Sequence, residues 1–126
     1  MLAPENCISM YFKFEKLLIW QRAMLFGEEV NFLCNNFPGI ERYNLATQMR
    51  KAADSIALNI SEGSILQSNP EYRKFIGYAI RSLAEVVTCM HKAKNRSYIS
   101  ESTFEELYSK SYHLMNMMVA FKRNIK

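Results

Sequence analysis

Apolar residues recur at intervals of three and four positions along most of this chain, which is the spacing of one buried face of an α-helix. Four stretches show the pattern, at about residues 15–35, 41–63, 69–95 and 100–125. Turn-forming residues such as Pro38 and Gly39 separate them, and no segment alternates with the period of a strand. Long helices joined by short turns run antiparallel to their neighbours. The pattern therefore predicts an all-α protein, an antiparallel up-down-up-down four-helix bundle.

The second stretch carries a seam of mostly small apolar residues, which would let another helix approach closely. At about 100° per residue, one face gathers Leu45, Ala46, Met49, Ala52, Ala53, Ile56, Ala57 and Ile60. Arg50 lies on the outward side, one turn before Asp54, and we expect these two to form an ion pair. Gly63 follows the seam. It is expected to end the helix, because glycine reaches the left-handed conformation cheaply.

A stripe of polar side chains runs beside this seam. Its members on the second helix are spaced seven, four and three residues apart: Gln48, Ser55, Asn59 and Glu62. We interpret the stripe as a buried or half-buried hydrogen-bond network that joins the second helix to the third through Ser82 and Glu85. Such a network sets helix register, since an unpaired buried polar group costs about 1–3 kcal/mol. The alternative is a surface that faces a ligand or another subunit.

The start of the third helix has two interpretations. Ser68 and Glu71 fit a capping box, in which the serine hydroxyl accepts from the backbone of the third helical residue. Alternatively, Asn69 caps the helix and Pro70 occupies its first position.

The 126 residues are enough for one domain with its own core, and 49% of them are hydrophobic. We expect residues 1–11 to be a flexible leader, with Met10 as an alternative start, and residues 12–126 to form a single four-helix-bundle domain. No apolar run approaches the roughly 20 residues of a membrane span, so a soluble, cytoplasmic protein without membrane contact is predicted. Cys7, Cys34 and Cys89 are odd in number and far apart, which favours free thiols in a reducing compartment.

The sequence offers little for catalysis or metal binding. His91 and His113 lie on different predicted helices, and neither follows a glutamate at ligand spacing. A di-metal site in a bundle needs several inward-facing Glu and His residues, and here only Glu62 and Glu85 are candidates. No glycine-rich phosphate loop occurs. We therefore expect no catalytic residue, no metal and no cofactor, and a protein that is not an enzyme.

Basic residues supply the functional hypothesis. The net charge is +4, and residues 70–96 hold six basic against two acidic residues, which accounts for the whole excess. Lysine and arginine bind nucleic acid mainly through phosphates, which supply affinity without reading sequence. The candidate phosphate contacts are Arg50, Lys51, Arg73, Lys74, Arg81, Lys92, Lys94 and Arg96. The alternative is an ordinary solvated helix surface.

The seam and stripe also carry a resemblance to a known family. The matching residues are Leu45, Gln48, Arg50, Ala52, Ala53, Ser55, Ile56, Asn59, Ile60, Glu62 and Gly63, with 20–23 upstream and Phe75, Ala79, Ser82, Leu83 and Glu85 downstream. This pattern resembles the signature of the four-helix-bundle family named after the 23S rRNA intervening-sequence protein, which also includes accessory proteins of diversity-generating retroelements. Asp54 and Ala57 depart from the commoner residues of that signature, and residues 64–69 lack the basic residues that family members often carry there.

The resemblance implies self-association, because members of the family are known as five-fold barrels of four-helix bundles. It also implies a partner among structured RNA, a nucleic-acid duplex or a reverse transcriptase. Tyr108, Tyr112 and Met115 widen the apolar surface of the last helix, which independently indicates subunit contacts. We expect a non-enzymatic homo-oligomer, by resemblance a pentamer, that binds RNA or DNA or assists a nucleic-acid enzyme. The alternative is a structural oligomerisation or protein-interaction module without a nucleic-acid role.

Overall fold

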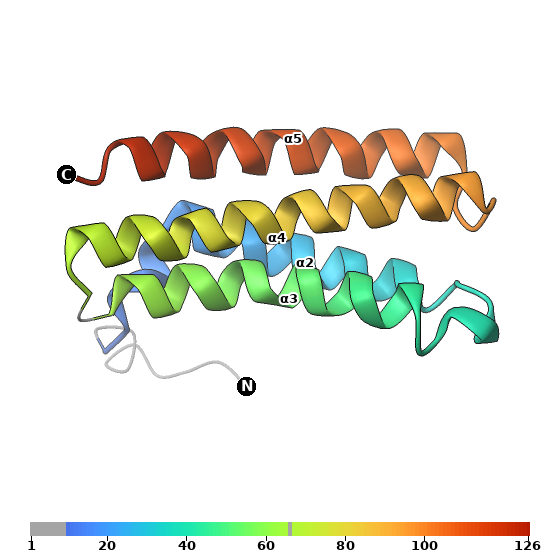
Figure 1. Ribbon diagram of the computed structural model, residues 1–126, viewed down its shortest axis with the longest axis horizontal. Coiled ribbons are helices and arrows are strands. Elements are labelled where there is room, and N and C mark those ends of the chain that lie inside the picture. Colours follow the sequence, from blue (N-terminus) through green and yellow to red (C-terminus); the bar gives the residue numbers. More distant parts are fainter. Residues whose placement is uncertain (1–9, 66) are drawn as a thin grey trace.

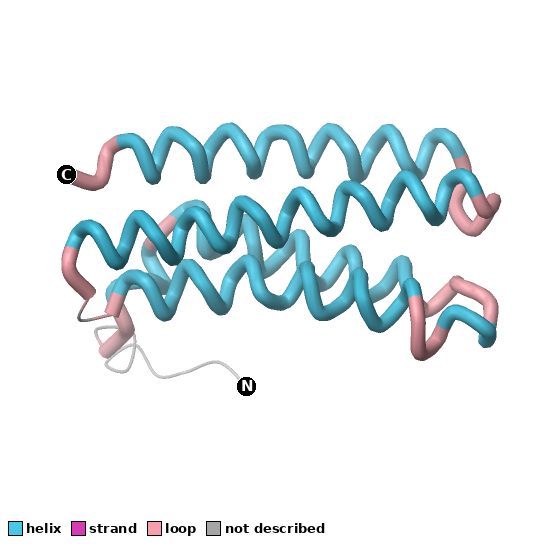
Figure 2. Tube along the Cα trace, in the orientation of Figure 1, coloured by secondary structure: helices cyan, strands magenta, loops and turns pink. Residues whose placement is uncertain are grey.

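The computed structural model describes residues 10–65 and 67–126, so that residues 1–9 of the expected leader lie outside the described chain. Its helices, in order, are η1 (Lys13–Lys16), α2 (Leu18–Cys34), η2 (Gly39–Glu41), α3 (Leu45–Ser64), α4 (Asn69–Asn95) and α5 (Glu101–Arg123). The two elements labelled η are short 3₁₀-helices, and no strand occurs among the described residues (Figure 2). The four long helices confirm the all-α prediction.

Successive long helices run in opposite directions, and their axes lie side by side (Figure 1). Side-chain contacts show the same register, because partner numbers rise on one helix as they fall on the next. Between α3 and α4, Gln48 pairs with Glu85 and Ser55 with Ser82. The α3–α4 border is the most extensive in the bundle and the α2–α5 border the least, so α5 is held mainly by α4.

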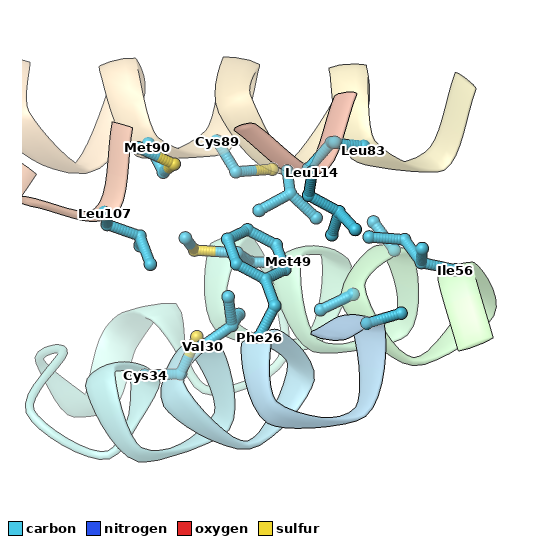
Figure 3. Packing of buried hydrophobic residues seen from close by; sticks show 14 of the residues in the cluster. Phe26, Val30, Cys34, Met49, Ile56, Leu83, Cys89, Met90, Leu107 and Leu114 are labelled. Atoms are coloured by element: carbon cyan, nitrogen blue, oxygen red, sulfur yellow. The ribbon is translucent and has the colours of Figure 1, made fainter. Parts of the chain in front are cut away.

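The core lies between the helices and receives apolar side chains from all four. Figure 3 shows Phe26, Met49, Leu83 and Leu114 pointing toward one another from α2, α3, α4 and α5. Every residue of the predicted α3 seam is buried. Because that seam is mostly alanine, α3 packs closely against both of its neighbours.

Two helices begin later than the periodicity predicted. The chain is extended at Leu17, which separates the turn of η1 from α2. Asn44 adopts a non-helical conformation, and α3 starts only at Leu45. The reason is local: the Glu41 carboxylate accepts a hydrogen bond from the Leu45 backbone N–H at 3.4 Å, which caps α3 from outside the helix.

The prediction for Gly63 was wrong. No described glycine has a positive φ, and α3 continues through Gly63 to Ser64. A Cβ atom at this position would lie only 2.6 Å from the Cβ of Phe75 on α4. Gly63 is therefore required for the close approach of two helices, not for a turn.

At the start of α4 the first of the two interpretations holds for the cap itself. Ser68 is the N-cap, and its hydroxyl accepts from the Glu71 backbone N–H at 3.3 Å. Pro70 lies in the first turn, where its missing N–H costs nothing.

Candidate nucleic-acid interface

The polar stripe lies along the α3–α4 border. The Ser55 hydroxyl donates to the carbonyl of Ala52 at 2.9 Å and lies 2.5 Å from the Ser82 hydroxyl on α4. The Asn59 amide donates to the Ser55 carbonyl at 2.8 Å, within α3. These serines are half-buried, and they couple the middle of the two helices.

The ends of the stripe are open to solvent. The Gln48 amide donates to the Glu85 carboxylate at 3.4 Å, and both side chains are exposed. Glu62 is also exposed, and its carboxylate makes no hydrogen bond or ion pair within residues 10–65 and 67–126. The six stripe residues thus form two cross-helix pairs and one bond inside α3, while Glu62 stays apart.

Arg50 is the first of four candidate cations that bind other parts of the bundle. Its guanidinium donates to the side-chain carbonyls of Asn31 and Asn35 at the end of α2, the former at 2.8 Å. The expected ion pair with Asp54 is absent from the described contacts. Arg50 points toward α2 because the carbonyl groups at that helix end attract a positive charge.

Arg73 and Lys94 connect α4 with the two ends of α5. The Arg73 guanidinium donates to the backbone carbonyls of Ile125 and Lys126 at 3.0 and 2.7 Å. The Lys94 ammonium lies 3.3 Å from the Glu101 carboxylate. Both cations have part of their hydrogen-bonding capacity engaged inside the chain, which weakens the case for them as phosphate contacts.

Arg96 belongs to a cluster that ties the α2–α3 turn to the α4–α5 turn. It forms an ion pair with Glu41 at 2.9 Å, and the Tyr98 hydroxyl donates to the same carboxylate oxygen at 2.6 Å. The left-handed φ of Ser97 and the bond from the Tyr98 N–H to the Ala93 carbonyl end α4 in a Schellman motif that brings Tyr98 into reach.

The Glu41 carboxylate at the centre of this cluster is only 8% exposed. The hydrogen bond from Tyr98 is the main cause that lowers the pKa of Glu41, and it raises the pKa of Tyr98 in turn. Sequence reasoning missed Glu41, because its partners lie 55 and 57 positions away and no local pattern connects them.

The other four candidate cations, Lys51, Lys74, Arg81 and Lys92, are exposed and make no ion pair within the described part of the chain. On α4, positions 74, 81 and 92 are seven and eleven residues apart, which places them within about 20° of one another around the helix. Lys51 lies on α3 beside the polar stripe, between Gln48 and Ser55 in sequence. We call the surface formed by these four cations the α3–α4 face.

Two further features modify the α3–α4 face. The Arg81 guanidinium lies 5.9 Å from the centre of the Tyr78 ring, within the range of a cation–π contact. Glu85 is exposed on the same side of α4 and lowers the positive potential between the cations. The face can therefore attract phosphates, with a moderate field.

The described residues offer no group of three His, Cys, Asp or Glu side chains that could hold a metal ion. Cys34 and Cys89 are free and buried, and burial raises the pKa of Cys34 to about 11, so its thiolate is scarce at neutral pH. The His91 ring packs on Phe104 at 4.9 Å between centroids, as a structural contact. Among the described helices, none combines the length and apolarity needed to cross a bilayer.

Comparison with known proteins agrees with this fold. The family described as 23S rRNA-intervening sequence protein matches residues 15–120. A crystal structure of a protein of unknown function from the S23 ribosomal protein family of Bacteroides thetaiotaomicron VPI-5482 is similar, with a TM-score of 0.79 and 15% identity over 85% of this chain and 100% of that one. No curated protein matches the sequence significantly. Because the family match spans most of the bundle, the chain belongs to the 23S rRNA-intervening sequence protein family.

Proposed function

We propose that this protein is a non-enzymatic, self-associating protein of the cytoplasm that binds the phosphate backbone of RNA or DNA through its α3–α4 face. The observation that carries the proposal is the alignment of Lys74, Arg81 and Lys92, three exposed cations without an ion-pair partner in the described chain. The family name, which refers to an rRNA intervening sequence, supports the same class of ligand.

The spacing of these cations suits a duplex. At 1.5 Å per residue, positions 74 and 92 are about 27 Å apart along α4, the length of about eight base pairs. Lys51 adds a positive charge on the neighbouring helix. Such contacts are made to the backbone and carry no sequence information.

Self-association would strengthen this interaction. One protomer with a net charge of +4 and acidic groups near its cations binds weakly by itself. Several linked copies engage one nucleic acid with a much higher effective concentration. Structured RNA or a duplex is the proposed ligand, and a reverse transcriptase, by resemblance to retroelement accessory proteins, is the proposed protein partner if the face assists a nucleic-acid enzyme.

The test is fluorescence anisotropy with labelled RNA and DNA duplexes at about 50 and 200 mM salt, where several phosphate contacts change affinity by orders of magnitude. The variant Lys74→Glu/Arg81→Glu/Lys92→Glu should abolish binding at the higher salt. Replacing each cation by glutamine should reduce the salt slope by about one per lost contact.

A matched control reverses three exposed cations elsewhere, Lys13, Arg42 and Arg123, and lowers the net charge from +4 to −2 in the same way. The control should retain much more affinity than the α3–α4 variant. Equal losses in the two variants would show a diffuse charge effect and overturn the assignment of the face. If the wild-type protein does not bind at the lower salt, the nucleic-acid role fails and the alternative of a structural interaction module stands.

A further inference from the structure

The outer side of α2 carries an apolar stripe that no other part of the described chain covers. Leu18, Leu25 and Phe32 are 53%, 64% and 72% exposed. They are seven residues apart, so they lie within about 40° of one another around the helix. A single exposed leucine is ordinary, but three large apolar residues at heptad spacing form the kind of seam that another helix covers.

A second apolar stripe lies on the side of α5 that borders α4. Its residues are spaced four, three and four apart: Tyr108, Tyr112, Met115 and Val119. Three of them are 41–60% exposed, and Met115 is half-buried. Tyr108, Tyr112 and Met115, with Ala84 and Val87 of α4, line a shallow hollow of about 240 Å³. This hollow can receive a protruding apolar side chain.

The two stripes are on adjacent sides of the bundle. Leu25 lines the cleft of about 420 Å³ between α2 and α5, together with Met117. Tyr112 lines the hollow between α5 and α4. Because the stripes are different and face different directions, one copy can bind the next head to tail, which produces a ring when the rotation closes.

Length and charge indicate that the occupant is a second copy of this chain. The α2 stripe spans fourteen residues and the α5 stripe eleven, or about 21 and 16 Å. Arg22 precedes Leu25 on α2 and Glu28 follows it, whereas Glu105 precedes the α5 stripe and Arg123 follows it. A parallel pairing of the two helices therefore brings opposite charges together at both ends.

We propose that the α2 stripe of one copy packs on the α5 stripe and its hollow in a second copy, as a heterologous interface. This inference rests on the self-association in the proposed function and names the surfaces that produce it. It does not depend on nucleic-acid binding, since the cations of the α3–α4 face lie outside both stripes.

The test compares Leu25→Glu and Tyr112→Glu by size-exclusion chromatography with light scattering at micromolar concentration. Each variant alone should have the mass of the 14.7 kDa protomer. Mixed together, they should form a dimer, because Leu25→Glu keeps an intact α5 stripe and Tyr112→Glu keeps an intact α2 stripe. Leu58→Glu, at a 56% exposed position on α3, is the matched control and should leave the oligomer unchanged.

Each other outcome overturns a specific part of the inference. If Tyr112→Glu remains an oligomer and only Leu25→Glu dissociates, the α2 stripe pairs with itself. If neither variant changes the wild-type mass, the stripes are not the interface, although self-association stands. If the wild-type protein is a monomer, self-association itself fails, while the anisotropy experiment still tests nucleic-acid binding. Circular dichroism checks that both variants fold, as expected for exposed sites.

Discussion

Gly63 offers the sharpest test of the packing, because a single methyl group there meets the backbone-proximal part of another helix. In Gly63→Ala the new Cβ would lie 2.6 Å from the Phe75 Cβ and 3.2 Å from the Tyr72 ring. The Phe75 Cβ cannot swing away by a rotamer change, so α3 and α4 must separate by several tenths of an ångström or more.

Overpacking of this kind costs about 1–3 kcal/mol. Alanine also has a better helix propensity than glycine, which returns up to about 1 kcal/mol. The net loss in the free energy of unfolding should be about 1–2 kcal/mol, which lowers Tm by roughly 4–8 °C for a chain of this size. Thermal unfolding followed by circular dichroism at one fixed protomer concentration measures the shift.

Gly77→Ala in the middle of α4 is the matched control. Its Cβ would meet only the Lys122 Cε, at an ordinary contact distance of 3.5 Å. The propensity gain should then dominate and stabilise the protein by about 0.5–1 kcal/mol. The packing argument is refuted if Gly63→Ala is as stable as Gly77→Ala.

Two further predictions concern buried titratable groups. Glu41→Gln removes the ion pair with Arg96, so it should lower Tm at pH 7. Because the folded-state pKa of Glu41 is lowered, the wild-type advantage is fully present above the unfolded pKa of about 4.3 and should shrink as pH falls below it; an advantage that persists at pH 2 would contradict this. In a Cys7→Ser background, Cys34 and Cys89 should resist a thiol reagent at pH 8 until the protein unfolds, since burial raises both pKa values. Rapid modification of the folded protein, followed by absorbance, would show that the thiols are accessible.

The helices and their buried faces were predictable because their signal is local. A period of three and four residues reflects the geometry of a single helix, so the α3 seam could be read from positions 45–60 without knowledge of its partner. The same logic limited the prediction at helix ends. Glu41 interrupts the pattern through contacts with Arg96 and Tyr98, which local spacing does not reveal.

The candidate site was predictable only as a set of residue types. Eight cations fitted phosphate contact equally well in the sequence, but Arg50, Arg73, Lys94 and Arg96 have oxygen partners elsewhere in the fold. The polar stripe was identified correctly as a border between two helices, yet nothing in its spacing indicated that Glu62 would stand apart.

The sequence by itself determined that this protein is a four-helix bundle and which face of each helix is buried, because both depend on neighbours three or four residues away. Only the tertiary structure decided which cations face solvent, why Gly63 must be a glycine, and that apolar stripes on α2 and α5 lie on adjacent sides. Those properties depend on atoms far apart in the chain, whose distances are set when the helices pack.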